Sequence, residues 1–216
     1  MNSQVAFSVK RIADSTVRRL SAYLRFLEDF ESRGLTTISS EELAKRGGTT
    51  SAQVRKDLSF FGSFGKRGLG YSVPELAGRL REILGLGREW RVIIVGAGKI
   101  GAALAQYRGF PQRGFSILAA YDNSADKIGR KLEGIPVRDI AHLESDIKRE
   151  KPDIVVLTVP ATEAQRVLDR VTKAGVRAIL NFAPTQLHAA PDVTVKTVNM
   201  AMELEGLSYS LTNREE

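Results

Sequence analysis

The stretch Val92-Ile93-Ile94-Val95-Gly96-Ala97-Gly98-Lys99-Ile100-Gly101 decides the fold of the second half of this 216-residue chain. Its four apolar residues predict a buried strand, and the three glycines after them have the G-x-G-x-x-G spacing at the start of an expected helix. In such a turn the first glycine permits the tight bend, the second lets the backbone approach a pyrophosphate, and the third lets the helix pack closely on the strand. The free N–H groups at the helix start favour a dianionic phosphate. We therefore predict that a dinucleotide binds at Gly96, Ala97, Gly98, Lys99, Ile100 and Gly101.

An acidic residue stands at the end of the next predicted strand. Asp122 follows the apolar run 115–121 and lies 21 residues past Gly101, near the spacing of about 20 expected for a ribose-binding acid. Its carboxylate can accept hydrogen bonds from both ribose hydroxyls and would repel a 2′-phosphate, although Asn123 and Lys127 could weaken that repulsion. The predicted cofactor is therefore NAD(H), and the alternative is a Rossmann-like domain with an empty or different ligand site, such as one for coenzyme A.

Strands alternate with helices from residue 90 to the C-terminus, which predicts an α/β domain with a mainly parallel sheet covered on both faces. The expected strands are 90–95, 115–121, 153–159, 177–182 and 193–198, and the expected helices lie near 99–107, 139–149, 162–174 and 200–212. Pro160, Asn181 and Phe182 follow or end strands at the carboxyl edge, where open sheets bind ligands. We add them to the predicted cofactor site, although a proline can simply end a strand and Asn181 can simply cap a helix.

The first 88 residues predict a helix-turn-helix. Apolar residues at helical spacing predict a first helix over about 15–32. Ser39 with Glu42, and Thr50 with Gln53, are capping patterns that start a short second helix and a third helix over about 51–60. A fourth helix is expected to begin at Pro74.

The third helix has two different faces. One is apolar, whereas the other carries Ala52, Arg55, Lys56 and Ser59 at i, i+3, i+4 and i+7. Arginine or lysine on an exposed face can donate to guanine in the major groove of DNA. The plain alternative is a charged surface helix.

The stretch after the third helix resembles a wing. Residues 62–71 hold four glycines around Lys66 and Arg67, and a wing needs glycine at its turns and cations at its tip for phosphate or minor-groove contacts. We predict a hairpin here, with Lys66 and Arg67 touching DNA.

Charge and composition limit the class of protein. Residues 1–88 hold 15 Lys and Arg against 9 Asp and Glu, and residues 89–216 hold 17 against 16, so the excess positive charge lies in the first part, as expected of a unit that meets a polyanion. A solvated basic face is the alternative. No apolar run approaches the roughly 20 residues that cross a bilayer, and the chain has no cysteine. We expect a cytoplasmic protein with no membrane or metal partner.

Enzyme chemistry finds little support in the sequence. The chain holds two histidines, His142 and His188, one in a charged predicted helix and one in a predicted loop. No HExxH, GxSxG or P-loop pattern is present, and no substrate domain follows the last predicted element. We predict a protein that is not an enzyme, and keep two alternatives, an NAD-dependent oxidoreductase and a partner protein that binds coenzyme A or a nucleotide.

Several motifs together resemble one family. They are Gln53-Val54-Arg55-Lys56-Asp57-Leu58, Phe61-Gly62, Gly65-Lys66-Arg67-Gly68-Leu69-Gly70-Tyr71, Val95-Gly96-Ala97-Gly98 and Asn181-Phe182-Ala183-Pro184. From about residue 10 to 211 the chain resembles the Rex family of bacterial redox-sensing repressors.

That resemblance implies a homodimer that binds double-stranded operator DNA and releases it when NADH outcompetes NAD⁺. It implies a winged helix-turn-helix domain over 1–86, a Rossmann NAD(H)-binding domain over 87–198 and a C-terminal helix, 199–216, that swaps between subunits. The DNA-binding residues it implies are Gln53, Arg55, Lys56, Ser59, Lys66 and Arg67. The apolar stripe Met200, Leu204, Leu207 and Leu211 agrees with a swapped helix, or packs on its own subunit.

The family's redox switch exchanges polar contacts among an arginine, a tyrosine and an aspartate. Matching motifs places the first two roles on Arg25 and Tyr107. The third position departs from the family pattern, because Asn199 stands where an acid is common. An amide cannot form the same ion pair with Arg25, although it retains hydrogen bonding.

Overall fold

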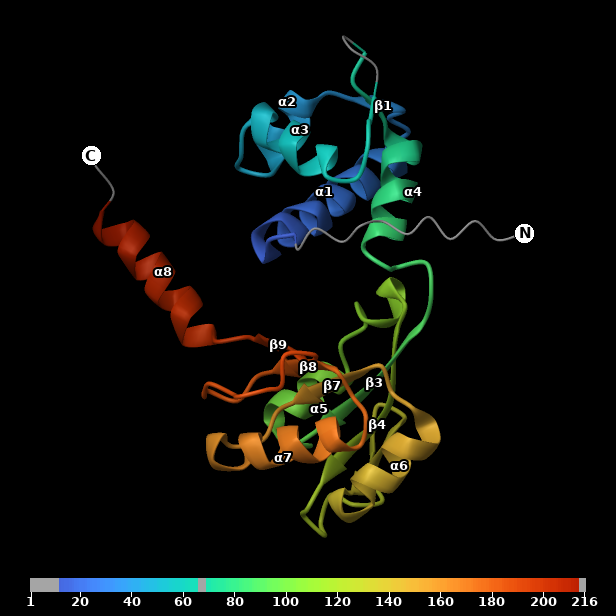
Figure 1. The fold of residues 1–216 in the computed structure, drawn as a ribbon, viewed down its shortest axis with the longest axis vertical. Coiled ribbons are helices and arrows are strands. Elements are labelled where there is room, and N and C mark those ends of the chain that lie inside the picture. The colour runs from blue at the N-terminus through green and yellow to red at the C-terminus, as the bar shows by residue number, and fades with distance from the viewer. Residues whose placement is uncertain (1–11, 66–68, 214–216) are drawn as a thin grey trace. The chain divides into compact units, whose positions relative to one another are not determined.

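The computed structural model describes residues 12–65 and 69–213, and the chain divides into two compact units, residues 1–88 and 89–216 (Figure 1). Each unit has an apolar core of its own. Two predicted DNA-binding residues, Lys66 and Arg67, lie outside the described residues.

The first unit contains the predicted helices α1 (Asp14–Ser32), α2 (Ser40–Arg46), α3 (Ser51–Ser59) and α4 (Val73–Ile83). The capping box at α2 is complete, since the N–H of Glu42 donates to Ser39 Oγ and the Glu42 carboxylate accepts from the N–H of Ser39. Thr50 caps α3 by accepting from the N–H of Gln53. These local signals confirm the predicted helix-turn-helix.

A short two-stranded sheet completes this unit. β1 (Thr37–Ile38) pairs antiparallel with β2 (Tyr71–Ser72), so the partner of Tyr71 is Ile38. The end of the stretch 62–71 thus pairs with the segment between α1 and α2. The two described ends of that stretch also lie close together, since a Cβ on Gly65 would lie 2.8 Å from the Tyr71 ring. The hairpin itself stays a prediction, because its tip lies outside the described residues. Gly70 permits the approach, because a Cβ on it would lie 2.4 Å from the carbonyl oxygen of Ile38.

The second unit is built on a seven-stranded sheet within the described residues, in the order β5-β6-β4-β3-β7-β8-β9. All its neighbours are parallel except β5 and β6. The strands are β3 (Trp90–Val95), β4 (Phe115–Asp122), β5 (Lys131–Leu132), β6 (Ile135–Asp139), β7 (Ile154–Leu157), β8 (Ala178–Asn181) and β9 (Thr194–Thr197). The predicted parallel sheet is confirmed, but β5 and β6 were missed.

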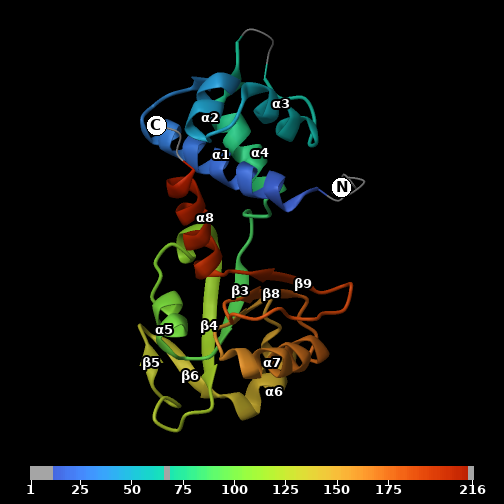
Figure 2. The same cartoon turned by 90° about the vertical axis from the view of Figure 1, so that its left-hand side faces the viewer.

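Helices cover both faces of this sheet. Figure 2 shows α5 (Lys99–Ala105) on one side and α6 (Leu143–Glu150) with α7 (Ala161–Lys173) on the other. Buried residues of α6 and α7 pack on β3, β4, β7 and β8, whereas Ala105 of α5 packs with the opposite face of the sheet. The helix predicted over 139–149 begins later, because the strand β6 and a short 3-10 turn (Ile140–His142) precede it.

The last helix, α8 (Met200–Thr212), lies apart from the sheet (Figure 1). All its residues are exposed, including Met200, Leu204, Leu207 and Leu211, each at least 60% exposed. The predicted apolar stripe is therefore present and is uncovered in the single chain.

The glycine turn joins β3 to α5 at very close range. A Cβ on Gly101 would lie 1.9 Å from the carbonyl oxygen of Gly96 and 2.9 Å from Thr158 Oγ1. Gly96 itself has φ +105°, a conformation in which other residues are strained. Gly98 differs, because a Cβ there would meet nothing within 4 Å.

We expect Gly101→Ala to lower the free energy of unfolding by about 1–3 kcal/mol, because the added methyl group must push α5 away from the turn. Thermal unfolding followed by circular dichroism measures the loss. Gly98→Ala is the matched control and should unfold close to the wild-type temperature. Equal losses in the two variants would contradict the packing role of Gly101.

Candidate functional site

Hydrogen bonds fix the glycine turn from two neighbouring strands. The N–H of Gly96 donates to the carbonyl oxygen of Tyr121 at the end of β4 (2.7 Å). From beyond β7, Thr158 Oγ1 donates to the carbonyl oxygen of Gly96 (2.7 Å). The turn is thus held in place before any ligand binds.

Asp122 lies beside this turn and is 8% exposed. Its Oδ2 accepts from the N–H of Ala97 (2.8 Å) and from Lys127 Nζ (3.0 Å), and its Oδ1 accepts from the N–H of Ser124 (2.9 Å). Burial alone would raise the pKa of the Asp122 carboxyl, but the Ser124 N–H, the Lys127 ammonium and the Ala97 N–H outweigh it and hold the pKa below its usual value.

These contacts leave Asp122 with little spare acceptor capacity. A carboxylate offers about four lone-pair sites, and three are used by Ala97, Lys127 and Ser124. With Lys127 in this position, one acceptor site of the carboxylate remains for a ribose hydroxyl. Accepting from both hydroxyls, as the sequence led us to expect, requires Lys127 to move aside.

A cavity of about 420 Å³ opens at the carboxyl ends of the strands. Gly96, Gly98, Asp122 and Thr158 line it together with Pro160. Five residues at the carboxyl ends of three strands, β3, β4 and β7, thus meet at the sheet edge where parallel α/β sheets bind ligands.

Two other predicted cofactor residues have different surroundings. Asn181 is fully buried, and its side chain accepts from the N–H of Ala183 (2.9 Å) and donates to the carbonyl oxygens of Ala183 and Thr185. Phe182 packs against the apolar core on the α5 side of the sheet. Neither lines the cavity beside Gly96, and Asn181 stabilises the loop after β8.

A larger cavity, of about 850 Å³, opens at the amino end of β4. Tyr107, Phe115 and Ile135 line it. It lacks a glycine turn and lies at the edge of the sheet opposite to the one where ligands bind in this architecture. We therefore take the smaller cavity as the candidate site.

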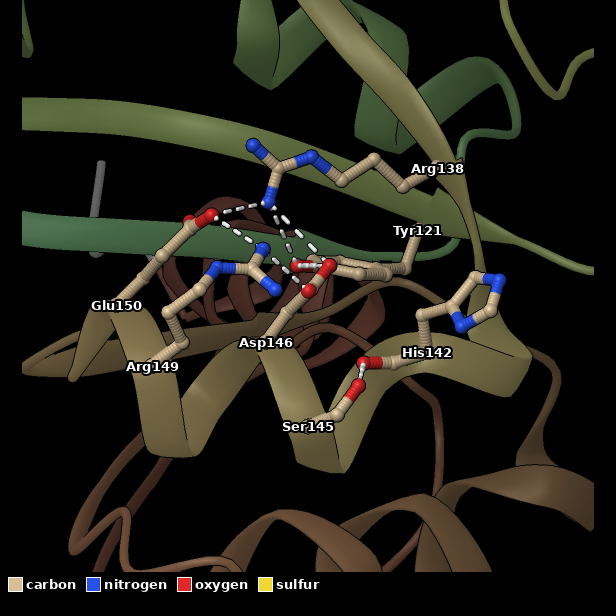
Figure 3. A network of polar contacts seen from close by, with 7 residues as sticks. All are labelled: Tyr121, Arg138, His142, Ser145, Asp146, Arg149 and Glu150. Atoms are coloured by element: carbon tan, nitrogen blue, oxygen red, sulfur yellow. Dashed lines mark hydrogen bonds and ion pairs between the residues drawn. The ribbon is translucent and has the colours of Figure 1, made fainter.

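A polar network supports the strand that ends in Asp122 (Figure 3). The Tyr121 hydroxyl donates to Asp146 Oδ2 (3.0 Å), and Arg138 Nη1 donates to Tyr121 Oη (3.2 Å) and Glu150 Oε1 (2.7 Å). Burial and the Asp146 carboxylate raise the pKa of Tyr121 to about 12. The network therefore joins β4 to β6 and α6 beneath the candidate site.

Neither His142 nor His188 lines the candidate cavity. In Figure 3 the His142 ring points away from the network, and its backbone carbonyl accepts from Ser145. Among the described residues, no group of three or more His, Asp or Glu side chains could hold a metal ion. Within the same residues, no helix is long and apolar enough to cross a membrane.

The second candidate surface is the outer face of α3. Arg55, Lys56 and Ser59 are exposed there, as predicted. Arg55 Nη1 donates to Ser40 Oγ at the start of α2 (3.0 Å). Gln53 is instead half-buried, and its Nε2 donates to Asp57 Oδ1 (2.8 Å).

The three predicted switch residues lie on different elements. Arg25 is exposed on α1 of the first unit, and Tyr107 is 55% exposed just after α5, where its ring meets Phe110 edge-on. Asn199 caps α8, since its Oδ1 accepts from the N–H groups of Ala201 (3.0 Å) and Met202 (3.4 Å). Aspartate and asparagine both cap helices, so α8 can begin at this position with either residue.

Sequence reasoning missed the buried ion pair between Arg19 and Asp57. Asp57 is fully buried, although charged residues are rarely buried unless paired. A signal was present, because Asp57 directly precedes Leu58 and lies three residues after Val54, on the edge of the apolar face of α3.

Comparisons with known proteins agree with this two-part arrangement. Residues 11–59 match a family model described as the N-terminus of a putative DNA-binding protein, and residues 87–185 match one described as a CoA binding domain. The redox-sensing transcriptional repressor Rex of Carboxydothermus hydrogenoformans is 46% identical over 93% of this chain and 97% of its own length. The Rex repressor of Desulfitobacterium hafniense is 43% identical over 94% and 97%.

Solved structures give the same result. The crystal structure of RSP in complex with beta-NAD⁺ and operator DNA has a TM-score of 0.89 and 38% identity, and covers 93% of each chain. RSP in complex with beta-NADH has a TM-score of 0.87 and 36% identity, over 94% of this chain and 96% of that one.

A helix-turn-helix unit joined to a Rossmann-type unit defines a transcription regulator with a nucleotide-binding sensor domain. Within that class, this chain belongs to the Rex family of redox-sensing transcriptional repressors. The curated relatives are named as repressors, not as enzymes.

We expect Asp122→Asn to lower the free energy of unfolding at pH 7 by about 1–3 kcal/mol, because hydrogen bonds to a charged partner are weakened. The folded pKa of Asp122 is lowered, so its stabilisation is fully present above the unfolded value of about 4 and is lost as the pH falls through the folded value. The difference between variant and wild type should therefore shrink below about pH 4. Chemical denaturation at several pH values measures it.

Asp126→Asn is the control, because Asp126 is an exposed carboxylate of the same loop. It should unfold like the wild type at each pH. A difference for Asp122→Asn that stays constant down to pH 3 would contradict a stabilising role for the ionised carboxylate.

Proposed function

We propose that this chain is a homodimeric repressor that binds operator DNA and releases it when NADH occupies the cavity beside the glycine turn. The observation that carries the proposal is the meeting of Gly96, Gly98 and Asp122 in one cavity, in a chain that also presents Arg55 and Lys56 on an exposed helix face. Relatives of this fold have been crystallised with beta-NAD⁺ and operator DNA, and with beta-NADH.

The residues at the turn suit a dinucleotide. Gly98 has open space where a side chain would stand, so a pyrophosphate can approach its backbone. Asp122 would accept from a ribose hydroxyl, and Pro160 would border the ligand. Lys99 and Ile100 are exposed in the first turn of α5, where backbone N–H groups have no partner within the helix. Bound NAD(H) would supply a nicotinamide whose charge differs between its oxidised and reduced forms.

The dimer would form through α8. In this proposal the chain consists of a winged-helix domain over 1–86, a cofactor domain over 87–198 and a C-terminal segment, 199–216, that swaps between subunits. The uncovered stripe Met200, Leu204, Leu207 and Leu211 supports this assignment, because monomeric proteins rarely leave such a face exposed. A protein that binds operators would work in the cytoplasm.

The switch in this chain would differ from that of its relatives in charge. Arg25 and Tyr107 hold the arginine and tyrosine positions, but Asn199 offers an amide in place of a carboxylate. Its Oδ1 already accepts from Ala201 and Met202. In place of an ion pair, Asn199 would offer Arg25 only a neutral acceptor, and the hydrogen bond of a guanidinium to an amide is weaker than its ion pair with a carboxylate.

We expect NADH, titrated at fixed salt, to reduce the affinity of the wild-type chain for operator DNA at least tenfold, a ligand-induced shift between two states worth about 1.4 kcal/mol or more. NAD⁺ and coenzyme A are the comparison ligands. Fluorescence anisotropy with a labelled duplex measures the affinities. Release by coenzyme A, with no effect of NADH, would support a coenzyme A sensor instead.

Gly98→Ala tests the site itself. It should bind DNA like the wild type and lose its response to NADH, because the new methyl group occupies the path of the pyrophosphate. An unchanged response would place the ligand elsewhere.

We expect Arg55→Ala to reduce the preference for operator over scrambled DNA by about 1–3 kcal/mol, since it removes a base contact. Lys66→Ala should weaken binding to both duplexes alike and lower the salt dependence. Equal, purely salt-like losses in the two variants would contradict base reading by Arg55.

A further inference from the structure

A buried carboxylate holds α3 against α1. Asp57, on α3, is 0% exposed and accepts four hydrogen bonds. Arg19 gives two of them, from Nε to Oδ2 (2.6 Å) and from Nη2 to Oδ1 (2.7 Å). Tyr23 Oη donates to Oδ2 (3.1 Å), and Gln53 Nε2 donates to Oδ1 (2.8 Å). We call these four residues the Asp57 cluster.

Helical spacing brings the donors together. Arg19 and Tyr23 are four residues apart on α1, and Gln53 and Asp57 are four residues apart on α3, so each pair lies on one face of its helix. Arg19 Nη2 also donates to Thr16 Oγ1 (3.1 Å), and this second contact restricts the position of the guanidinium. The Asp57 cluster therefore joins the facing sides of two helices.

The cluster keeps Asp57 ionised. Burial alone would raise its pKa, but the hydrogen bonds from Arg19, Gln53 and Tyr23 outweigh that effect and lower it. Burial and the Asp57 charge in turn raise the pKa of Tyr23 to about 12, so the phenol keeps its proton and remains a donor. All four hydrogen bonds therefore persist together at neutral pH.

Directional hydrogen bonds fix the orientation of α3 more strictly than apolar packing does. Val54 and Leu58 anchor α3 in the core, but apolar contacts tolerate small rotations and shifts of a helix. A two-pronged arginine–carboxylate pair is sensitive to both, because its two N–H groups must stay in line with two oxygens. Asp57 lies on the same helix as Arg55. In the proposed function, the exposed side chain of Arg55 contacts DNA bases.

We propose that Asp57, with Arg19, Tyr23 and Gln53, is a positioning cluster that sets the orientation of the base-reading face of α3. This inference rests on the proposed DNA binding. It also reassigns Gln53, which the sequence suggested as a DNA-binding residue. The Gln53 amide donates to Asp57 and is half-buried, so it orients the helix and does not itself read a base.

The experiment measures base preference at every position of a DNA site, using the full-length chain. A duplex selected by the wild type from a randomised library is the probe, and each base pair is then replaced in turn and compared with a scrambled duplex. Tyr23→Phe and Gln53→Ala are the test variants, because each removes a single donor to Asp57. Arg55→Ala is the matched variant of a base-reading residue on the same helix, and Ile83→Val, in the same core, controls for mild loss of stability.

For both test variants we expect the preference for the selected over the scrambled duplex to fall about tenfold. The loss should be spread over all base positions of the half-site, because the whole face is tilted. Arg55→Ala should lose its preference at one or two adjacent positions, and Ile83→Val should keep the wild-type pattern. NADH binding should be unchanged in all four variants, since the cavity lies in the other unit.

Three results would overturn the inference and leave the proposed function intact. The first is full base preference in Tyr23→Phe and Gln53→Ala. The second is a loss in Gln53→Ala confined to one base position, which would mean that Gln53 contacts a base, and the third concerns the stability control. If Ile83→Val lost as much base preference as the test variants, the Asp57 cluster would only stabilise the unit, and the inference would be overturned. A wild-type chain that selects no sequence at all would overturn the proposed function itself.

Discussion

The second unit depends on one close approach, that of Gly101 to the carbonyl oxygen of Gly96. Because Gly101 has no side chain, α5 starts directly against the end of β3, and the intervening turn stays tight enough for the N–H of Ala97 to reach Asp122. Thr158 closes the other side by donating to Gly96. The glycine spacing is therefore first a packing requirement, and the ligand cavity is its consequence.

The sequence predicted most elements of the fold because their signals are local. Apolar periodicity and capping residues such as Ser39 act within one or two helical turns, and each helix predicted from them is present. β6 was missed because Pro136 and Arg138 interrupt a strand of five residues, which leaves no apolar run to detect. The pairing of Tyr71 with Ile38 was missed for a related reason, since nothing in either segment specifies a partner more than thirty residues away.

The same difference between local signals and contacts of distant segments applies to the candidate site. The turn and Asp122 followed from spacing, but the contact of Lys127 with Asp122, which changes how the carboxylate can meet a ribose, depends on where the loop after β4 folds back. The Arg19–Asp57 pair joins residues 38 apart in sequence. Arginine and aspartate are common surface residues, so only burial reveals that these two are structural.

Both units use a buried aspartate for the same physical purpose. Asp57 and Asp122 each accept hydrogen bonds from separate segments, and in each case those donors outweigh the cost of burying the charge. Apolar packing supplies most of the stability of either unit, but it specifies orientation weakly. A carboxylate with three or four donors specifies it strongly, because moving any one segment leaves a buried charge without its partner. Asn199 at the start of α8 departs from this use of charge, because its neutral amide caps the helix through Oδ1 alone.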